Sequence, residues 1–123
     1  MSYVSPFTGD VIQPTDVSYI SLTITNTSLQ LVWPSTSTTS TSVAARVIEV
    51  TATGTSFLLM PPANQASVGQ DALIRNIGAT SFTVKDYTGV NTIVTVAAGQ
   101  AQYIYITTNA TAAGTWGIIA FGI

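Results

Sequence analysis

The chain has 123 residues, of which 46% are hydrophobic and only 7% are charged, and its net charge is −2. This length fits one domain, but globular proteins usually carry about a quarter charged residues. The three basic residues, Arg46, Arg75 and Lys85, are too few to form the cationic surface that nucleic acid or an anionic membrane requires. Because Ser and Thr stand where charged residues are usual, we expect neighbouring proteins to cover much of the surface.

Residues 1–16 are expected to form an extended arm, because Pro6, Gly9 and Pro14 interrupt them and no hydrophobic period is present. The arm either packs on its own domain or lies across a neighbouring subunit. For the second case the candidate interface residues are its large apolar side chains, Tyr3, Val4, Phe7, Val11 and Ile12. The first residues lack the basic and apolar regions of a signal peptide, so we expect synthesis in a cytoplasm without export.

From residue 17 onwards, apolar and polar residues alternate with the period of two that is typical of half-buried strands. The alternation at 20–24 and 29–33, on either side of Asn26 and Thr27, predicts a hairpin, and residues 35–42 are expected to be an exposed Ser/Thr-rich loop. If the strand at 43–53 is regular, Arg46 and Glu49 are expected on its opposite faces. Trp33 and Trp116 are expected to be largely buried. Further strands are predicted at 43–53, 56–60, 72–77, 81–86, 92–97, 102–107 and 116–121.

This pattern predicts an all-β fold in which residues 17–123 form an eight- to nine-stranded antiparallel β-sandwich, jelly-roll-like, behind the N-terminal arm. A related Greek-key sandwich or a squat barrel fits the same pattern, because strand order cannot be read from alternation.

The sequence offers no set of residues for catalysis. It contains no His and no Cys, which removes Ser-His-Asp, Cys-His and zinc-thiolate arrangements. The carboxylates Asp10, Asp16, Asp71 and Asp86 lie in the arm or beside turns, and Glu49 stands alone in a strand. We therefore expect no enzymatic activity, no cofactor and no metal site.

Tyr103 and Tyr105 lie on one face of a predicted strand, opposite Ile104 and Ile106. Exposed aromatic side chains on a sheet fill subunit interfaces or bind sugars. Alternatively, both faces of this strand are simply buried. We take Tyr103 and Tyr105 as the second set of candidate interface residues.

Residues 73–99 (LIRNIGATSFTVKDYTGVNTIVTVAAG), the segment Tyr103-Ile104-Tyr105 and residues 107–116 (TTNATAAGTW) resemble a β-module of tailed-bacteriophage virion proteins. The opening PFTGDVIQPTDVSY is similar to small phage structural proteins. Together these segments cover more than half of the chain.

The resemblance implies a virion component that is made in the host cytoplasm and binds the outer surface of the capsid as a cement, or decoration, protein. It implies the major capsid protein as partner and a homotrimer as the assembled state. A module of a head or tail fibre that takes part in host adhesion is the alternative, and a lectin-like sugar-binding domain is a third possibility. The short chain without repeats favours the cement protein.

Overall fold

The structure, a computed structural model, describes residues 3–4, 11–12, 19–33 and 43–121. Two short strands, β1 (Tyr3–Val4) and β2 (Val11–Ile12), pair with each other in antiparallel fashion. The other strands are β3 (Tyr19–Thr25), β4 (Ser28–Gln30), β5 (Val47–Thr53), β6 (Phe57–Leu59), β7 (Asp71–Asn76), β8 (Phe82–Lys85), β9 (Thr92–Val96), β10 (Ala101–Thr108) and β11 (Thr115–Phe121). A single 3₁₀ turn, η1 (Ala63–Gln65), follows β6, and the described residues contain no α-helix. The expected all-β class is confirmed.

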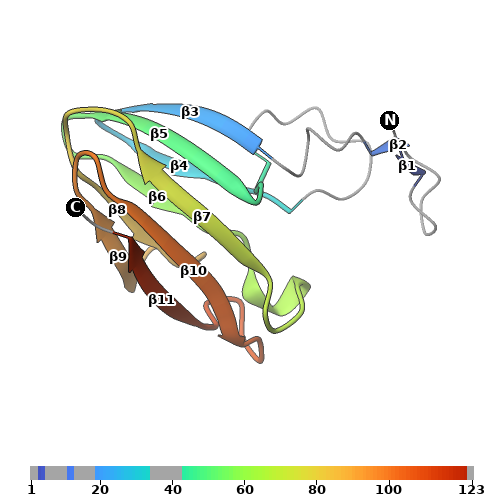
Figure 1. Cartoon of the computed structure of the whole chain (residues 1–123). Helices are drawn as coiled ribbons and strands as arrows, with labels where there is room; N and C mark the ends of the chain where they lie inside the picture. Colours follow the sequence, from blue (N-terminus) through green and yellow to red (C-terminus); the bar gives the residue numbers. More distant parts are fainter. Residues whose placement is uncertain (1–2, 5–10, 13–18, 34–42, 122–123) are drawn as a thin grey trace.

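Apart from the β1–β2 pair, the strands form two sheets that lie as two layers (Figure 1). The five-stranded sheet has the order β11-β10-β7-β5-β3, and the four-stranded sheet has the order β4-β6-β8-β9. Between β3 and β8 the chain changes sheet after every strand, so that β3–β4, β5–β6 and β7–β8 are three successive turns of a flattened coil. The antiparallel pairs β8–β9 and β10–β11 follow this coil. Among the described residues, no helix has the length and apolar character needed to span a membrane.

The expected antiparallel pairing is wrong within the coil. β3 pairs with β5, β5 with β7, β4 with β6 and β6 with β8, and all four pairs are parallel. The hairpin expected over residues 20–33 is also wrong, because β3 and β4 lie in different sheets. Alternation with a period of two shows which face of a strand is buried, but it carries no information on which strand lies beside it.

Asparagine side chains fix two of the turns at which the chain changes sheet. Asn26, at φ 51°, lies in the loop between β3 and β4. Its side chain accepts a hydrogen bond at 3.1 Å from the backbone N–H of Thr55, which lies in the loop between β5 and β6. Asn76 is fully buried, donates to the carbonyl oxygens of Thr80 and Val96, and accepts from the Gly78 backbone N–H. Because these contacts satisfy its amide group, Asn76 stabilises the corner without leaving a buried polar atom unpaired.

The core lies between the two sheets. Alternate residues of each long strand point into it, and the cluster includes Leu22, Ile24, Ile48, Val50, Ile74, Ile104, Leu58, Phe82, Val84 and Val96. Both Trp side chains pack against this cluster and are partly buried, and neither is among the exposed large hydrophobic residues. Each indole N–H donates to a backbone carbonyl oxygen, Trp33 to Pro62 at 2.6 Å and Trp116 to Ala113 at 3.1 Å.

Candidate interaction surfaces

The outer face of the five-stranded sheet, the face that points away from the core, carries a continuous row of large side chains. Cross-strand register places Tyr19, Val47, Leu73, Tyr103 and Ile119 side by side, one from each of the five strands. We call these five residues the apolar row. The exposed fractions of the two end residues, Tyr19 and Ile119, are 48% and 47%, and the middle three residues are half-buried. Such a row is the kind of surface that interface cores use.

Tyr103 and Tyr105 therefore lie side by side on one face, as the sequence predicts, and both are half-buried. Their ring centroids are 5.8 Å apart. Tyr105 lies opposite Gly117 of β11, and a Cβ atom at Gly117 would lie 2.3 Å from the ring carbon that bears the Tyr105 hydroxyl. Glycine at position 117 thus lets the Tyr105 ring cover the neighbouring strand, which widens the aromatic area on this face.

Two groups, each of a tyrosine, a carboxylate and an arginine, lie along the same face. In the first, the Tyr19 hydroxyl donates to Glu49 Oε1 at 2.7 Å, and Arg75 Nη1 lies 3.3 Å from Glu49 Oε2. In the second, the Tyr103 hydroxyl donates to Asp71 Oδ2, and Arg46 Nε lies 2.7 Å from Asp71 Oδ1. The two cations and two anions cancel within the face, so a partner meets a surface of no net charge.

The hydrogen bonds to carboxylates also keep the tyrosines protonated. The bond to Glu49 raises the pKa of Tyr19 above its ordinary value of 10.0, and the bond to Asp71 raises the pKa of Tyr103 in the same way. A carboxylate acceptor favours the neutral phenol, which donates a proton to the bond, over the phenolate. These side chains are therefore suited to contact and hydrogen bonding rather than to nucleophilic chemistry.

Arg46 and Glu49 do not point to opposite faces, because the regular strand that this expectation required does not include Arg46. The strand begins at Val47, so Arg46 lies just outside it and is not bound by the alternation. Its side chain reaches Asp71, which belongs to the same outer face as Glu49 and Arg75.

The candidate interface residues of the arm are only partly covered by the structure. Tyr3 and Val4 of β1 pair with Ile12 and Val11 of β2, and the backbone of all four is described. Phe7 lies outside the described residues. The structure therefore does not test whether these five residues form an interface.

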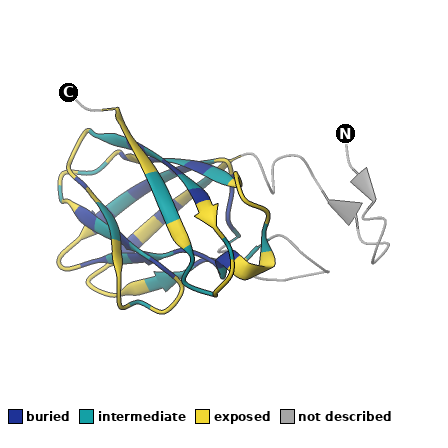
Figure 2. Ribbon diagram, turned by 90° about the horizontal axis from the view of Figure 1, so that it is seen from below, coloured by how far each residue is buried: buried dark blue, intermediate teal, exposed yellow. Residues whose placement is uncertain are grey.

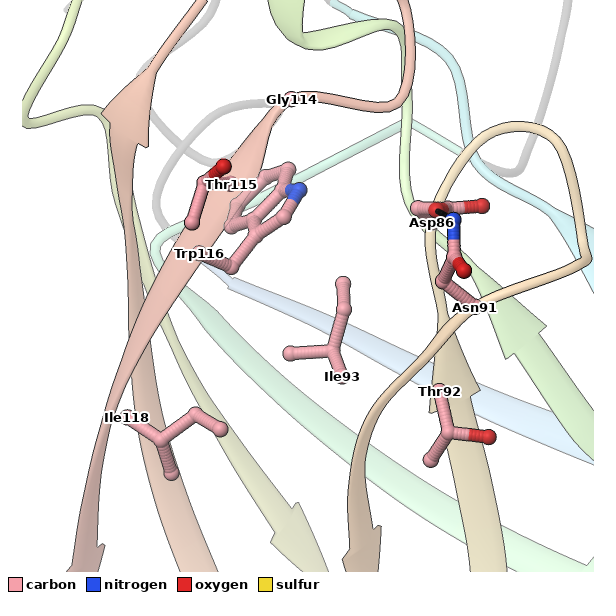
Figure 3. Close-up of a pocket in the computed structure, with 8 residues that line it drawn as sticks. All are labelled: Asp86, Asn91, Thr92, Ile93, Gly114, Thr115, Trp116 and Ile118. Carbon is pink, nitrogen blue, oxygen red and sulfur yellow. Dashed lines mark hydrogen bonds between the residues drawn. The ribbon is translucent and has the colours of Figure 1, made fainter.

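A second surface feature is a cleft of about 300 Å³ between β9 and β11 (Figure 3). These two strands end their sheets on the same side of the molecule (Figure 1). Ile93 extends into it from β9, and Trp116 and Ile118 extend into it from β11 (Figure 3). Asp86, Asn91 and Thr92 line the side opposite β11. The cleft is thus apolar in the middle and polar at one wall.

The loop before β11 positions Trp116 at this cleft. Asn109 Nδ2 donates to the Ala66 carbonyl oxygen at 2.8 Å, and the Ala63 backbone N–H donates to the Ala112 carbonyl oxygen at 2.8 Å. Gly114, at φ 63°, passes so close to η1 that an added Cβ atom would lie 2.4 Å from the Ala63 Cβ atom. The loop is therefore held against η1 by contacts that only a glycine at position 114 permits.

Two β-bulges flank the cleft, one in each sheet. Val84 of β8 pairs with Val94, but the next residue, Lys85, pairs with Thr92, so Ile93 is an extra residue in β9. In the same way, Trp116 of β11 pairs with Ile106 but Thr115 pairs with Thr108, so Thr107 is an extra residue in β10. Bulges change the direction of side chains and are frequent beside binding sites.

Asp86 anchors the polar wall. It is 2% exposed, and its carboxylate accepts hydrogen bonds from the Thr88 hydroxyl, the Gly89 backbone N–H and Asn91 Nδ2. Burial raises the pKa of Asp86, but the hydrogen bonds from Thr88 and Asn91 outweigh it, so the pKa lies below its ordinary value of 3.8. The carboxylate is therefore ionised at neutral pH.

Within the described part of the chain, no three His, Cys, Asp or Glu side chains gather closely enough to hold a metal ion. Comparisons of the chain with protein-family models, with curated proteins and with solved structures return no match.

Sequence reasoning missed Tyr19, Val47, Leu73 and Ile119 as companions of Tyr103, and it missed the cleft. The alternation of each strand marks these residues as outward-facing, but their adjacency depends on the strand order β3-β5-β7-β10-β11. The two bulges leave no recognisable signal in the sequence.

Proposed function

We propose that the chain is a structural virion protein that binds the outer surface of a phage capsid and stabilises it as a cement, or decoration, protein. The observation that supports this proposal best is the outer face, with its apolar row and its internally paired charges. A face of this kind suits a permanent contact with another protein, because burying it leaves no charge without a partner.

In this proposal the two sheets act as a β-sandwich whose five-stranded side meets protein, and the arm of residues 1–16 extends to the major capsid protein. The copies associate as a homotrimer beside β10 and β11. Much of β11 is exposed (Figure 2), and its exposed apolar residues on the outer face, Ile119 and Phe121, support association at this edge. Exposed edge strands readily pair with or pack against other chains.

The test is co-sedimentation of the purified protein with capsids of the virus that encodes it, measured for the wild type and for Ile119→Arg. The substitution places a charge within the apolar row, and we expect at least a ~30-fold loss of affinity, the equivalent of about 2 kcal/mol. Val90→Arg is the matched control, because Val90 is a 77% exposed apolar residue in the turn between β8 and β9, away from the outer face. Equal occupancy of capsids by Ile119→Arg and the wild type would refute a role for the apolar row.

A head- or tail-fibre module that takes part in host adhesion is the second candidate. The cleft beside Trp116 is the observation that favours it, since adhesion requires a site for a ligand on the host surface. Under this alternative the protein should bind host cells or their surface material and should leave emptied capsids undecorated.

A further inference from the structure

We propose that the cleft between β9 and β11 is a binding site for a neutral saccharide of one or two sugar rings. This inference does not depend on the outer face or on a capsid, because the cleft lies between the two sheets at their open side (Figure 3). Its volume of about 300 Å³ is at the small end of ligand pockets, which suits a ligand of this size.

The apolar part of the cleft matches the hydrocarbon face of a sugar ring. Trp116 presents a half-buried indole whose N–H is already bound to the Ala113 carbonyl oxygen, so its remaining surface is hydrocarbon and π face. Ile93 and Ile118 point toward the same space (Figure 3). The C–H groups on one face of a pyranose pack well against such a surface, because the positive hydrogens meet the negative face of the aromatic ring.

The polar part of the cleft matches the hydroxyl groups at the edge of the ring. Asn91 uses its Nδ2 group on Asp86, and among the described residues its Oδ1 atom has no hydrogen-bond partner. This atom is a free acceptor beside the apolar floor, and polar groups placed in this way fix the orientation of a ligand in small-molecule sites.

The charge of the cleft selects a neutral ligand. Asp86 lines the polar wall as an ionised carboxylate, and none of the other lining residues is charged. A ligand with a carboxylate or a phosphate would approach this anion in a partly desolvated site without a cation to balance it. The matched pair galactose and galacturonate therefore tests the charge preference with little change of shape.

The experiment follows Trp116 fluorescence in Trp33→Phe, a variant that leaves Trp116 as the single tryptophan. We titrate glucose, galactose, mannose and N-acetylglucosamine to concentrations well above the millimolar range. The β-linked disaccharides of these sugars that are available are titrated in the same way. We expect a saturable change with at least one of them, and a loss of affinity of about tenfold when galacturonate replaces galactose. A parallel titration of the wild-type chain by NMR, read at the two indole N–H signals, should move the Trp116 signal and leave the Trp33 signal in place.

Two neighbouring variants make the test specific. Ile118 and Ile119 are adjacent in β11, have similar exposed fractions of 44% and 47%, and lie on opposite faces of the strand. Ile118→Arg fills the cleft and should abolish saccharide binding, whereas Ile119→Arg should bind as the wild type does.

The absence of a saturable response to every neutral sugar would overturn the proposal. It would also be overturned if Ile118→Arg bound as well as Ile119→Arg, or if galacturonate bound as well as galactose. None of these outcomes bears on decoration of capsids, which is tested at Ile119. The two proposals can therefore fail separately.

Discussion

Substitution of Gly114 by alanine should destabilise the domain by about 2–5 kcal/mol. The left-handed backbone at φ 63° disfavours any side chain by roughly 1–2 kcal/mol. The added Cβ atom would also lie 2.4 Å from the Ala63 Cβ atom and 2.8 Å from the Thr108 carbonyl oxygen, and overpacking of this kind costs about 1–3 kcal/mol more. For a domain of this size, the sum lowers Tm by roughly 8–20 °C.

Gly69 provides the control, because it separates the backbone cost from the steric cost. Its φ is 94°, but an added Cβ atom would have no neighbour within 4 Å. Gly69→Ala should therefore show the conformational cost alone, about 1–2 kcal/mol. Both variants are measured by urea unfolding, followed by far-UV circular dichroism and by tryptophan fluorescence.

A double-mutant cycle with Ala63→Gly then identifies the contact. Removing the Ala63 methyl group should recover part of the loss caused by Gly114→Ala, with a coupling free energy above ~0.5 kcal/mol. If Gly114→Ala and Gly69→Ala destabilised the protein equally, or if Ala63→Gly gave no recovery, the close packing of the loop on η1 would be refuted. The position of Trp116 would then need another explanation.

Three further predictions follow from charge and from the arm. Because the pKa of Asp86 is lower in the folded chain than its ordinary value, its contribution to stability is present at neutral pH and is lost as pH falls below about 4 and through the folded pKa. In acid unfolding, Asp86→Asn should show a smaller loss of stability than the wild type, and parallel curves would contradict this. Deletion of residues 1–14 should leave the two sheets folded by circular dichroism and remove attachment to capsids, and unchanged occupancy would show that the arm is dispensable. Attachment should change little between low and high salt, since Arg46 and Arg75 are already paired within the chain, whereas release by salt alone would point to Lys85.

The positions of the strands could be predicted from the sequence because every long strand buries one face. Leu22 and Ile24 of β3, and Ile104 and Ile106 of β10, point into the core while their neighbours do not. The partners of the strands could not be predicted in the same way. Ser28–Gln30 looks like the return strand of a hairpin, but its three residues pair with β6 in the other sheet.

The candidate surfaces show the same limit at the level of side chains. Alternation predicted that Tyr103 and Tyr105 share a face, but the contact of Tyr103 with Asp71 joins residues 32 positions apart and requires β10 to lie beside β7. The segment 107–116 could be recognised as a connector rich in small residues. Its role in holding Trp116 could not, because Asn109 binds Ala66, 43 positions away in the chain.

Strand β11 connects the two proposals. Its odd-numbered residues, Ile119 and Phe121, belong to the outer face, while Trp116 and Ile118 face the cleft. An end strand with large apolar side chains on both faces is a liability for an isolated chain, because it invites uncontrolled pairing. An assembly that covers the outer face reduces this liability and leaves the other face open. A chain fixed through its outer face would keep the cleft accessible, so that attachment to a particle and capture of a small ligand could occur on the same strand without competing.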